Sequence, residues 1–391
     1  MSSVAAARSL SETARHIGEA VAGPAADAVD RDARFPREAM AALREERMLG
    51  ALVPRALGGL GATIGDVAAS CEALGRSCAS TAMIYAMHQI EVACLVRHGH
   101  ASPYFREYLA QLARHEWLIA SATSEQGVGG DLRHSICAVE KNDACIRVTK
   151  EAPVISYGEE ADDILLTARR SPDAAPADQV LVLARNDGIR LARTGEWDTL
   201  GMRGTRSLGF TLEVSGSAEQ IVPVPFSDVA SQTMVPVSHA LWSAVWLGIA
   251  TDAVGRARAF VRAEARRTPG AVPPGAFRLA ETVAELDAMK ATVHGGLGDF
   301  EQHQDNPEAL VGLGFAIRMN NLKMSASRMA PAIVSSALGV CGISGYRCDS
   351  QFSLGRHLRD AHSAALMISN DRVLSANAAM LLVHKDDRRK D

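Results

Sequence analysis

The chain has 391 residues, of which 47% are hydrophobic and 22% are charged, a composition typical of a soluble globular protein with two or three domains. Its 41 basic and 45 acidic residues give a formal net charge of −4, which argues against a general nucleic-acid or membrane-surface binder. Seven scattered cysteines without a CxxC pair predict reduced thiols and a cytoplasmic protein, and no spacing of cysteines or histidines indicates a metal site.

Residues 1–115 are predicted to form an N-terminal helical domain. Phe35-Pro36-Arg37-Glu38 places a proline at a helix start with an acidic residue in the first turn. Two further helices are expected from about Ile64 to Leu74 and from Thr81 to His98. The second of these is apolar on almost every side, which predicts that it is buried.

From about Trp117 the pattern changes to short runs of β-branched and apolar residues separated by Gly, Asp, Pro and Asn. These runs predict a middle antiparallel β-domain over residues 116–226. The expected strands cover residues 118–123, 136–139, 146–149, 164–167, 180–184 and 210–214.

Helical spacing returns after about Ser227 and predicts a C-terminal four-helix bundle over residues 227–391. The four candidate helices cover residues 242–267, 275–297, 307–338 and 361–384. Residues 229–251 carry no formal charge, but they include Ser, Gln, Thr and His and therefore indicate a buried core helix rather than a membrane span. The predicted class is α+β, in the order helical, β, helical.

Five segments, in order along nearly the whole chain, resemble motifs of the acyl-CoA dehydrogenase superfamily of flavoproteins. Any one of them is a weak signal, but five in sequence on a helix–β–helix plan are a strong one. The segments are Val53–Gly61, Ser124–Asp131, Val154–Gly158, Leu200–Thr205, and Gly342–Tyr346 followed by Arg356–Ala361.

The resemblance implies a bound FAD and an acyl-CoA dehydrogenase-like fold. By analogy, Ser124 and Ser156 hydrogen-bond to the flavin ring and Ile155 packs against it. Glycines at 127, 129 and 130 permit a turn that lets backbone approach a ligand closely, and Gly130 is expected to contact substrate.

Family enzymes are mostly tetramers in which FAD spans two subunits, so a homotetramer is expected here. The glycine turn with Gly342 and Gly345 resembles the segment that meets the FAD pyrophosphate of a neighbouring subunit. Arg266, four residues before Gly270, matches the arginine that also holds this pyrophosphate.

The chain departs from the family at the catalytic base. Counting from Arg359, the usual glutamate position falls on Ile368, which follows Met367, and both are expected to line the substrate site. The second known position of the base lies within residues 238–248, which contain no carboxylate.

Three other residues are candidates for the missing chemistry. Asp371 is one helical turn beyond Ile368 and is either a base or a surface acid. His362 is either a catalytic group or a buried or interface histidine bonded to Asp360. His88 either lines the substrate cavity or makes a hydrogen bond in the core.

These observations leave three functions open. The first is an FAD-dependent dehydrogenase or oxidase of acyl thioesters, carried on coenzyme A or a carrier protein, with a displaced base and an electron-transfer partner. The second is a two-component monooxygenase that uses O₂ and reduced flavin, FAD or FMN, supplied by a reductase. The third is a non-redox flavoprotein of the same fold.

Overall fold

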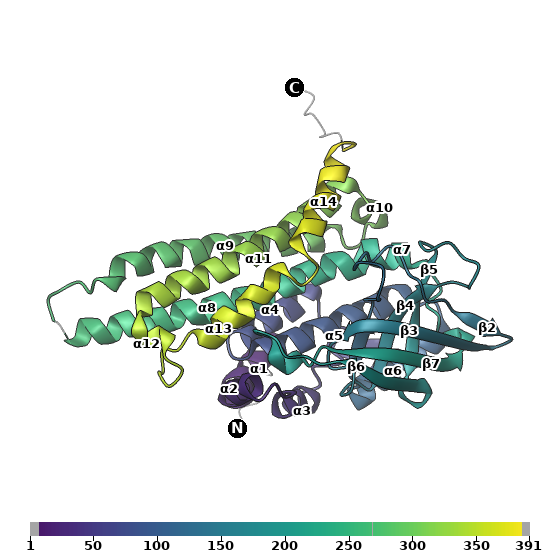
Figure 1. Cartoon of the computed structure of the whole chain (residues 1–391), viewed down its shortest axis with the longest axis horizontal. Helices are drawn as coiled ribbons and strands as arrows, with labels where there is room; N and C mark the ends of the chain where they lie inside the picture. Colours follow the sequence, from purple (N-terminus) through teal and green to yellow (C-terminus); the bar gives the residue numbers. More distant parts are fainter. Residues whose placement is uncertain (1–7, 268, 385–391) are drawn as a thin grey trace, which may run out of the picture.

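The computed structural model describes residues 8–267 and 269–384, and the chain forms three successive parts in the predicted order (Figure 1). Capping boxes start two of the N-terminal helices, at Ser9 with Glu12 and at Thr63 with Asp66. The N-terminal helices are α1 (Leu10–Ile17), α2 (Gly23–Arg31), α3 (Arg37–Glu45), α4 (Ile64–Gly75), α5 (Ala79–His98) and α6 (Pro103–His115).

The middle part contains two small sheets. One has the order β1 (Ile119–Ala122), β4 (Asp163–Arg169), β5 (Gln179–Arg185), and the other has the order β2 (Glu140–Asn142), β3 (Cys145–Ile155), β7 (Leu208–Ser217), β6 (Ile189–Gly195). Most pairs are antiparallel as predicted, but β1 pairs with β4 in parallel. The prediction of a purely antiparallel domain is therefore wrong at this one pair, which joins the helical part to the sheet.

Two strand predictions differ from the structure for physical reasons. The predicted strand 136–139 is reduced to an isolated bridge at Ala138, because the backbone N–H groups of Ile136 and Cys137 donate to the buried Glu125 carboxylate instead of to a strand. Strand β6 was not expected, because it is a mostly exposed strand with two arginines and little apolar signal.

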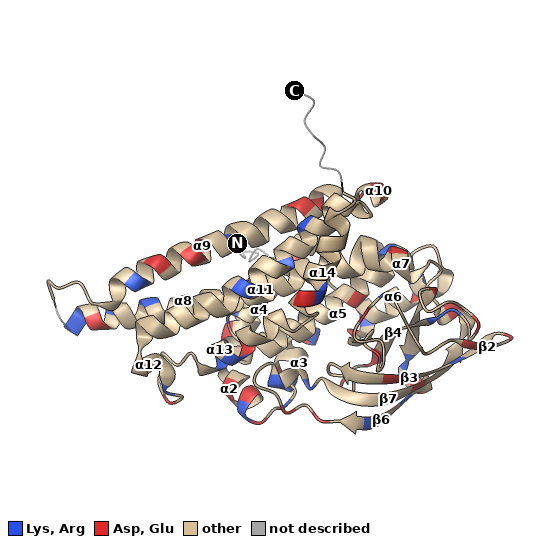
Figure 2. Cartoon of the chain, turned by 45° about the horizontal axis from the view of Figure 1, so that its top comes forward, with Lys and Arg blue, Asp and Glu red and all other residues tan. Residues whose placement is uncertain are grey.

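The C-terminal part is built on three long helices, α8 (Val235–Arg267), α9 (Gly275–His303) and α11 (Leu313–Cys341), with short helices around them. Charged residues of both signs are mixed along α9 (Figure 2). The expected fourth helix, 361–384, is instead broken into α13 (Gly355–His362) and α14 (Asn370–Leu381) by a turn around Ile368. The other short helices are α7 (Phe226–Val229), α10 (Pro307–Leu310) and α12 (Ile343–Tyr346).

The core lies where α4 and α5 pack against α8. Two helical stretches, Ala79–His98 and Phe226–Arg267, are long and apolar enough by composition to cross a membrane, and both are mostly buried inside the fold. This agrees with the prediction that residues 229–251 belong to a buried core helix.

Candidate functional site

Two chain segments meet just beyond the end of β1. The Ser124 hydroxyl donates a hydrogen bond of 2.8 Å to the carbonyl of Val154. The β3–β7 register shifts between Ala152 and Ile155, so Val154 leaves the ladder, and 39% of this residue is exposed. An apolar side chain therefore stands exposed beside the Ser124 hydroxyl and close in sequence to that of Ser156.

The hydroxyl protons at this surface already have partners within the chain. Ser124 gives its proton to Val154, so toward a ligand it presents an acceptor oxygen rather than the donor expected from the resemblance. The Ser156 hydroxyl lies 2.7 Å from that of Ser207, which in turn lies 2.9 Å from the Thr205 hydroxyl. Because Thr205 donates to the Met202 carbonyl, Ser207 has one proton to share between Ser156 and Thr205.

A glycine turn follows Ser124, with positive φ angles at Gly127, Gly129 and Gly130. The turn is anchored by Glu125, which accepts hydrogen bonds from the Ser135 hydroxyl and two backbone N–H groups. Burial alone would raise the pKa of Glu125, but the Ser135 hydrogen bond and the buried Lys150 ammonium, 3.4 Å away, lower it below its usual value. Glu125 is thus held as a carboxylate that ties the turn to the sheet.

The start of α14 lies against this turn. Arg372 donates from Nη1 to the Gly130 carbonyl at 3.0 Å, and a Cβ at position 130 would collide with the Arg372 guanidinium. The structure therefore brings Gly130 together with the segment that contains Met367 and Ile368. Ile368 has a φ of 50° and is 37% exposed, an unusual backbone for a β-branched residue.

Lys323, on α11, holds the Ile368 turn from beneath. It is completely buried, and its Nζ donates to the Ile368 carbonyl and to the Asn370 side chain, both at 2.6 Å. Burial lowers the pKa of Lys323 to about 8. Within the described ranges, no carboxylate lies at ion-pair distance from this ammonium group.

A buried imidazole accompanies Lys323. His239, on α8, is 1% exposed, and its Nδ1 lies 3.2 Å from the Met319 carbonyl. Burial, and then the charge of Lys323, lowers the pKa of His239 to about 3. The sequence analysis missed both residues. The signal for Lys323 was a lysine among apolar neighbours in a long helix, and the signal for His239 was a histidine within residues 238–248, which contain no carboxylate.

Comparison with known proteins identifies the family. The acyl-CoA dehydrogenase N-terminal domain family matches residues 5–116, and the acyl-CoA dehydrogenase C-terminal domain family matches residues 229–371. The chain belongs to the acyl-CoA dehydrogenase superfamily. The fold expected from the sequence motifs is confirmed.

Relatives in this superfamily differ in activity. The amino sugar nitrososynthase DnmZ of Streptomyces peucetius is 24% identical over 86% of this chain and 84% of its own. A cyclohex-1-ene-1-carbonyl-CoA dehydrogenase of Syntrophus aciditrophicus is 24% identical over 93% of this chain and 86% of its own. The FMN-bound structure of TdsC, a dibenzothiophene monooxygenase from Paenibacillus sp. A11-2, superimposes with a TM-score of 0.83 at 20% identity, covering 97% of this chain and 98% of that one.

The residues at the Ser124–Val154 surface fit the flavin of the acyl-CoA dehydrogenase superfamily. A flat ring needs an exposed apolar contact, polar groups at its edge and backbone that can approach closely. Val154 offers the exposed apolar contact, and the hydroxyls of Ser124 and Ser156 offer the polar groups. Gly129 offers backbone that a ligand can approach closely, because an added Cβ there would meet no atom within 4 Å. These residues are the ones that would hold the ring.

Two residues predicted to contact the flavin or the substrate, Ile155 and His88, are buried in the structure. Ile155 is completely buried, so a ring on this surface meets Val154, and contact with Ile155 would require the strand to rearrange. His88 is also completely buried; the Ile119 N–H donates to its Nδ1 at 3.0 Å and its Nε2 donates to the Leu49 carbonyl at 2.9 Å. With both ring nitrogens bonded to backbone and its pKa lowered by burial to about 4, His88 is a neutral core residue rather than a cavity-lining one.

The two candidate bases, Asp371 and His362, are exposed to solvent, Asp371 in the first turn of α14 and His362 at the end of α13. Met367 is half-buried against the core. Among the residues that the structure describes, no three His, Cys, Asp or Glu side chains gather as a metal site would require.

The predicted pyrophosphate contacts lie away from the ring surface within one chain. Arg266 is near the end of α8 and Gly342 precedes α12, at the end of the bundle opposite the β-domain (Figure 1). Gly342 is exposed with a φ of 55°, while Gly345 is buried where a Cβ would lie 2.6 Å from that of Cys341. A site that uses both groups of residues therefore needs a second copy of the chain.

Proposed function

We propose that this protein is a flavin-dependent monooxygenase that uses reduced flavin and O₂. The observation that carries the proposal is the turn at the position of the family's base. There the side chain is that of Ile368, which cannot accept a proton, and the nearest buried charge is the Lys323 ammonium beneath it.

Dehydrogenation of an acyl thioester needs a base to remove the α-proton, and such a base typically accelerates a reaction by about 10²–10⁴-fold. The described side chains near Ile368 are poor candidates for this base. Asp371 is exposed, and His239 has a pKa of about 3, too low for an efficient proton acceptor at neutral pH. Lys323 and Arg372 are cations.

A monooxygenase has no need of that base. Reduced flavin, when bound, would supply the two electrons that, together with two protons, allow one atom of O₂ to be added to the substrate while the other leaves as water. In this chain Val154 and the two serines would support the ring, and Lys323 places a positive charge beneath the Ile368 turn, where it would stabilise negative charge that develops beside that turn. The similarity to an amino sugar nitrososynthase and to TdsC supports the same proposal.

The reduced flavin would be FAD or FMN delivered by a separate flavin reductase. The experiment combines the protein, a flavin reductase, NADH and ¹⁸O₂ with dibenzothiophene and with a nucleotide-linked amino sugar. Mass spectrometry is expected to find one ¹⁸O atom in a product from at least one of these substrates. A Ser124→Ala, Ser156→Ala double variant should form less of this product when flavin is limiting.

A second experiment tests for acyl-CoA dehydrogenase activity. Oxidised flavoprotein is mixed without oxygen with short, medium and long acyl-CoA thioesters, and the visible flavin absorbance is followed. We expect no bleaching. Bleaching by any thioester would overturn the proposal in favour of the dehydrogenase, and neither product nor bleaching would favour a non-redox flavoprotein.

A further inference from the structure

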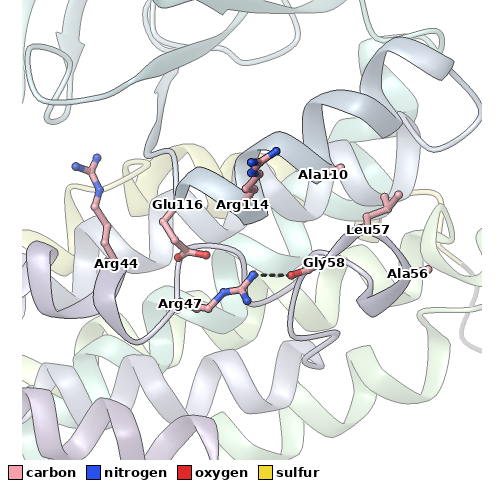
Figure 3. A pocket seen from close by; sticks show the side chains of 8 residues that line it. All are labelled: Arg44, Arg47, Ala56, Leu57, Gly58, Ala110, Arg114 and Glu116. Atoms are coloured by element: carbon pink, nitrogen blue, oxygen red, sulfur yellow. Dashed lines mark hydrogen bonds between the residues drawn. The ribbon is translucent and has the colours of Figure 1, made fainter.

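A second feature of the surface lies at the other end of β1. Glu116 precedes this strand and Ser124 follows it, so the strand separates the two places. A pocket of about 680 Å³ opens there between α3, α6 and the loop that joins α3 to α4 (Figure 3). Its lining consists of Arg44, Arg47, Ala56, Leu57, Gly58, Ala110, Arg114 and Glu116.

Three guanidinium groups line this pocket. Arg47 has a φ of 58°, and its Nη2 donates to the Gly58 carbonyl at 2.8 Å and to the Ala113 carbonyl at 3.2 Å. These carbonyls fix the guanidinium and carry no formal charge of their own, and among the described residues the one carboxyl group that lines the pocket is that of Glu116. Arg114 is exposed on α6 and makes no hydrogen bond or ion pair within the described part of the chain. Its donors are free for a ligand.

The acidic groups of the pocket do not offset these charges. Arg44 is paired with Asp162 at 2.7 Å. Glu116 is 6% exposed, and its carboxylate accepts from the backbone N–H groups of Leu49 at 2.7 Å and Gly50 at 3.2 Å. Burial raises the pKa of Glu116 to about 7, so this group is partly neutral near neutral pH. The pocket therefore carries an excess of positive charge.

The rest of the lining is apolar and small. Ala56, Leu57 and Ala110 form it, from the loop and from α6 (Figure 3). A guanidinium group matches a phosphate through paired hydrogen bonds, and an apolar wall suits a flat organic group. The guanidinium groups together with the apolar wall distinguish this pocket from a surface that only attracts anions.

We propose that this pocket binds a phosphate-bearing small molecule, with the phosphate on Arg47 and Arg114 and the organic group on Leu57. The site is separate from the Ser124–Val154 surface and does not depend on the proposed monooxygenase activity. The ligand that we propose is a nucleoside diphosphate. Inorganic phosphate or pyrophosphate could bind the same two arginines, because they carry the same phosphate group.

The test is calorimetric titration of the full chain, carrying its flavin, with ADP, inorganic pyrophosphate and sulfate. We expect ADP to bind more tightly than pyrophosphate, and sulfate to bind least. Arg114→Gln should weaken ADP binding about tenfold, since a charged hydrogen bond to phosphate is being removed. Arg47→Gln should weaken it further, provided its thermal melt shows a folded protein.

The matched control is Arg262→Gln, an exposed arginine on α8 outside the pocket. It should leave ADP affinity unchanged. No binding of ADP or pyrophosphate, equal affinities for the two, or the same affinity in Arg114→Gln as in the unaltered chain would each overturn the proposal. Flavin content, measured in parallel, should stay constant, which separates this site from the flavin site.

Discussion

Lys323 links the bundle core to the turn that carries Ile368. Its two hydrogen bonds, to the Ile368 carbonyl and the Asn370 side chain, are made by an ammonium group with no exposure to solvent. Positive φ angles also occur at Tyr157, beside Ser156, and at Met202. Strained backbone often concentrates at functional sites, and here it is found next to a predicted ring contact and in the turn over α11.

Replacing Lys323 by Met should loosen this turn. The Ile368 carbonyl and Asn370 lose a partner, which costs about 1–3 kcal/mol locally, although the burial cost of the charge disappears as well. We expect faster amide hydrogen exchange over residues 366–372 and weaker flavin-dependent activity, with little change in overall melting temperature. Lys290→Met, at a partly exposed lysine of α9 that pairs with Asp287 at 3.3 Å, is the control. Unchanged exchange over this segment would show that Lys323 does not hold the turn.

Glu91 provides a prediction about pH. This α5 residue is 2% exposed, its Oε2 has no hydrogen-bond partner among the described residues, and burial raises its pKa to about 8. A carboxyl with a raised folded-state pKa stabilises the protein most below the unfolded pKa of about 4, and that stability is lost as the pH rises toward 8. Glu91→Gln should therefore flatten the decline in melting temperature between pH 5 and about pH 8. Glu140→Gln, on exposed β2, should retain it, and parallel curves for all three proteins would contradict the assignment.

The serines give a binding prediction. Ser124→Ala and Ser156→Ala should each weaken flavin binding about fivefold, since one hydrogen bond contributes about 1 kcal/mol. Ser231→Ala, whose hydroxyl bonds within its own helical turn at 2.8 Å, is the control. Equal dissociation constants for oxidised flavin in all four proteins, measured by fluorescence quenching, would remove both serines from the site.

At the level of elements, the sequence predicted the helix–β–helix order and most strands, because these depend on apolar periodicity. It did not predict the break between α13 and α14, since residues 361–384 keep a helical pattern and the break depends on Lys323, far away in sequence. Likewise, the residues 136–139 look like a strand, and Glu125 takes their N–H groups. The motif residues Ser124 and Gly130 are site residues proposed from sequence, whereas Lys323 and His239 are singled out by contacts that no local sequence pattern records.

The turn between α13 and α14 can be tested by relieving its strain. A left-handed backbone costs a residue with a Cβ roughly 1–2 kcal/mol, and glycine avoids this cost. Ile368→Gly should therefore leave the free energy of unfolding unchanged or raise it by up to about 1 kcal/mol. Ile343→Gly, at the start of α12, should lower it by about 1 kcal/mol. Urea unfolding measures both, and equal destabilisation by the two changes would show that Ile368 is not strained.

On the scale of the whole molecule, α12 and the start of α9 lie at the end of the bundle away from the β-domain (Figure 1), and large apolar side chains are exposed there. Phe277 near the start of α9 is 74% exposed, and Ile343 and Tyr346 of α12 are 72% and 73% exposed. The predicted pyrophosphate contacts Arg266 and Gly342 lie at the same end. Exposed apolar groups beside these predicted cofactor contacts are what an assembly of identical chains would cover.

We therefore predict a homotetramer whose assembly and flavin binding are coupled. Phe277→Glu with Tyr346→Glu places charge on this surface and should shift the mass measured by light scattering toward smaller species. Flavin retention should fall in the same samples, because each ring surface would lose the Arg266 and Gly342 of its neighbour. Leu200→Glu, at a residue 64% exposed in the β-domain, is the control and should leave both unchanged. Dissociation with full flavin retention would place the complete flavin site within one chain, and an unaltered protein that is monomeric at saturating flavin would contradict the tetramer itself.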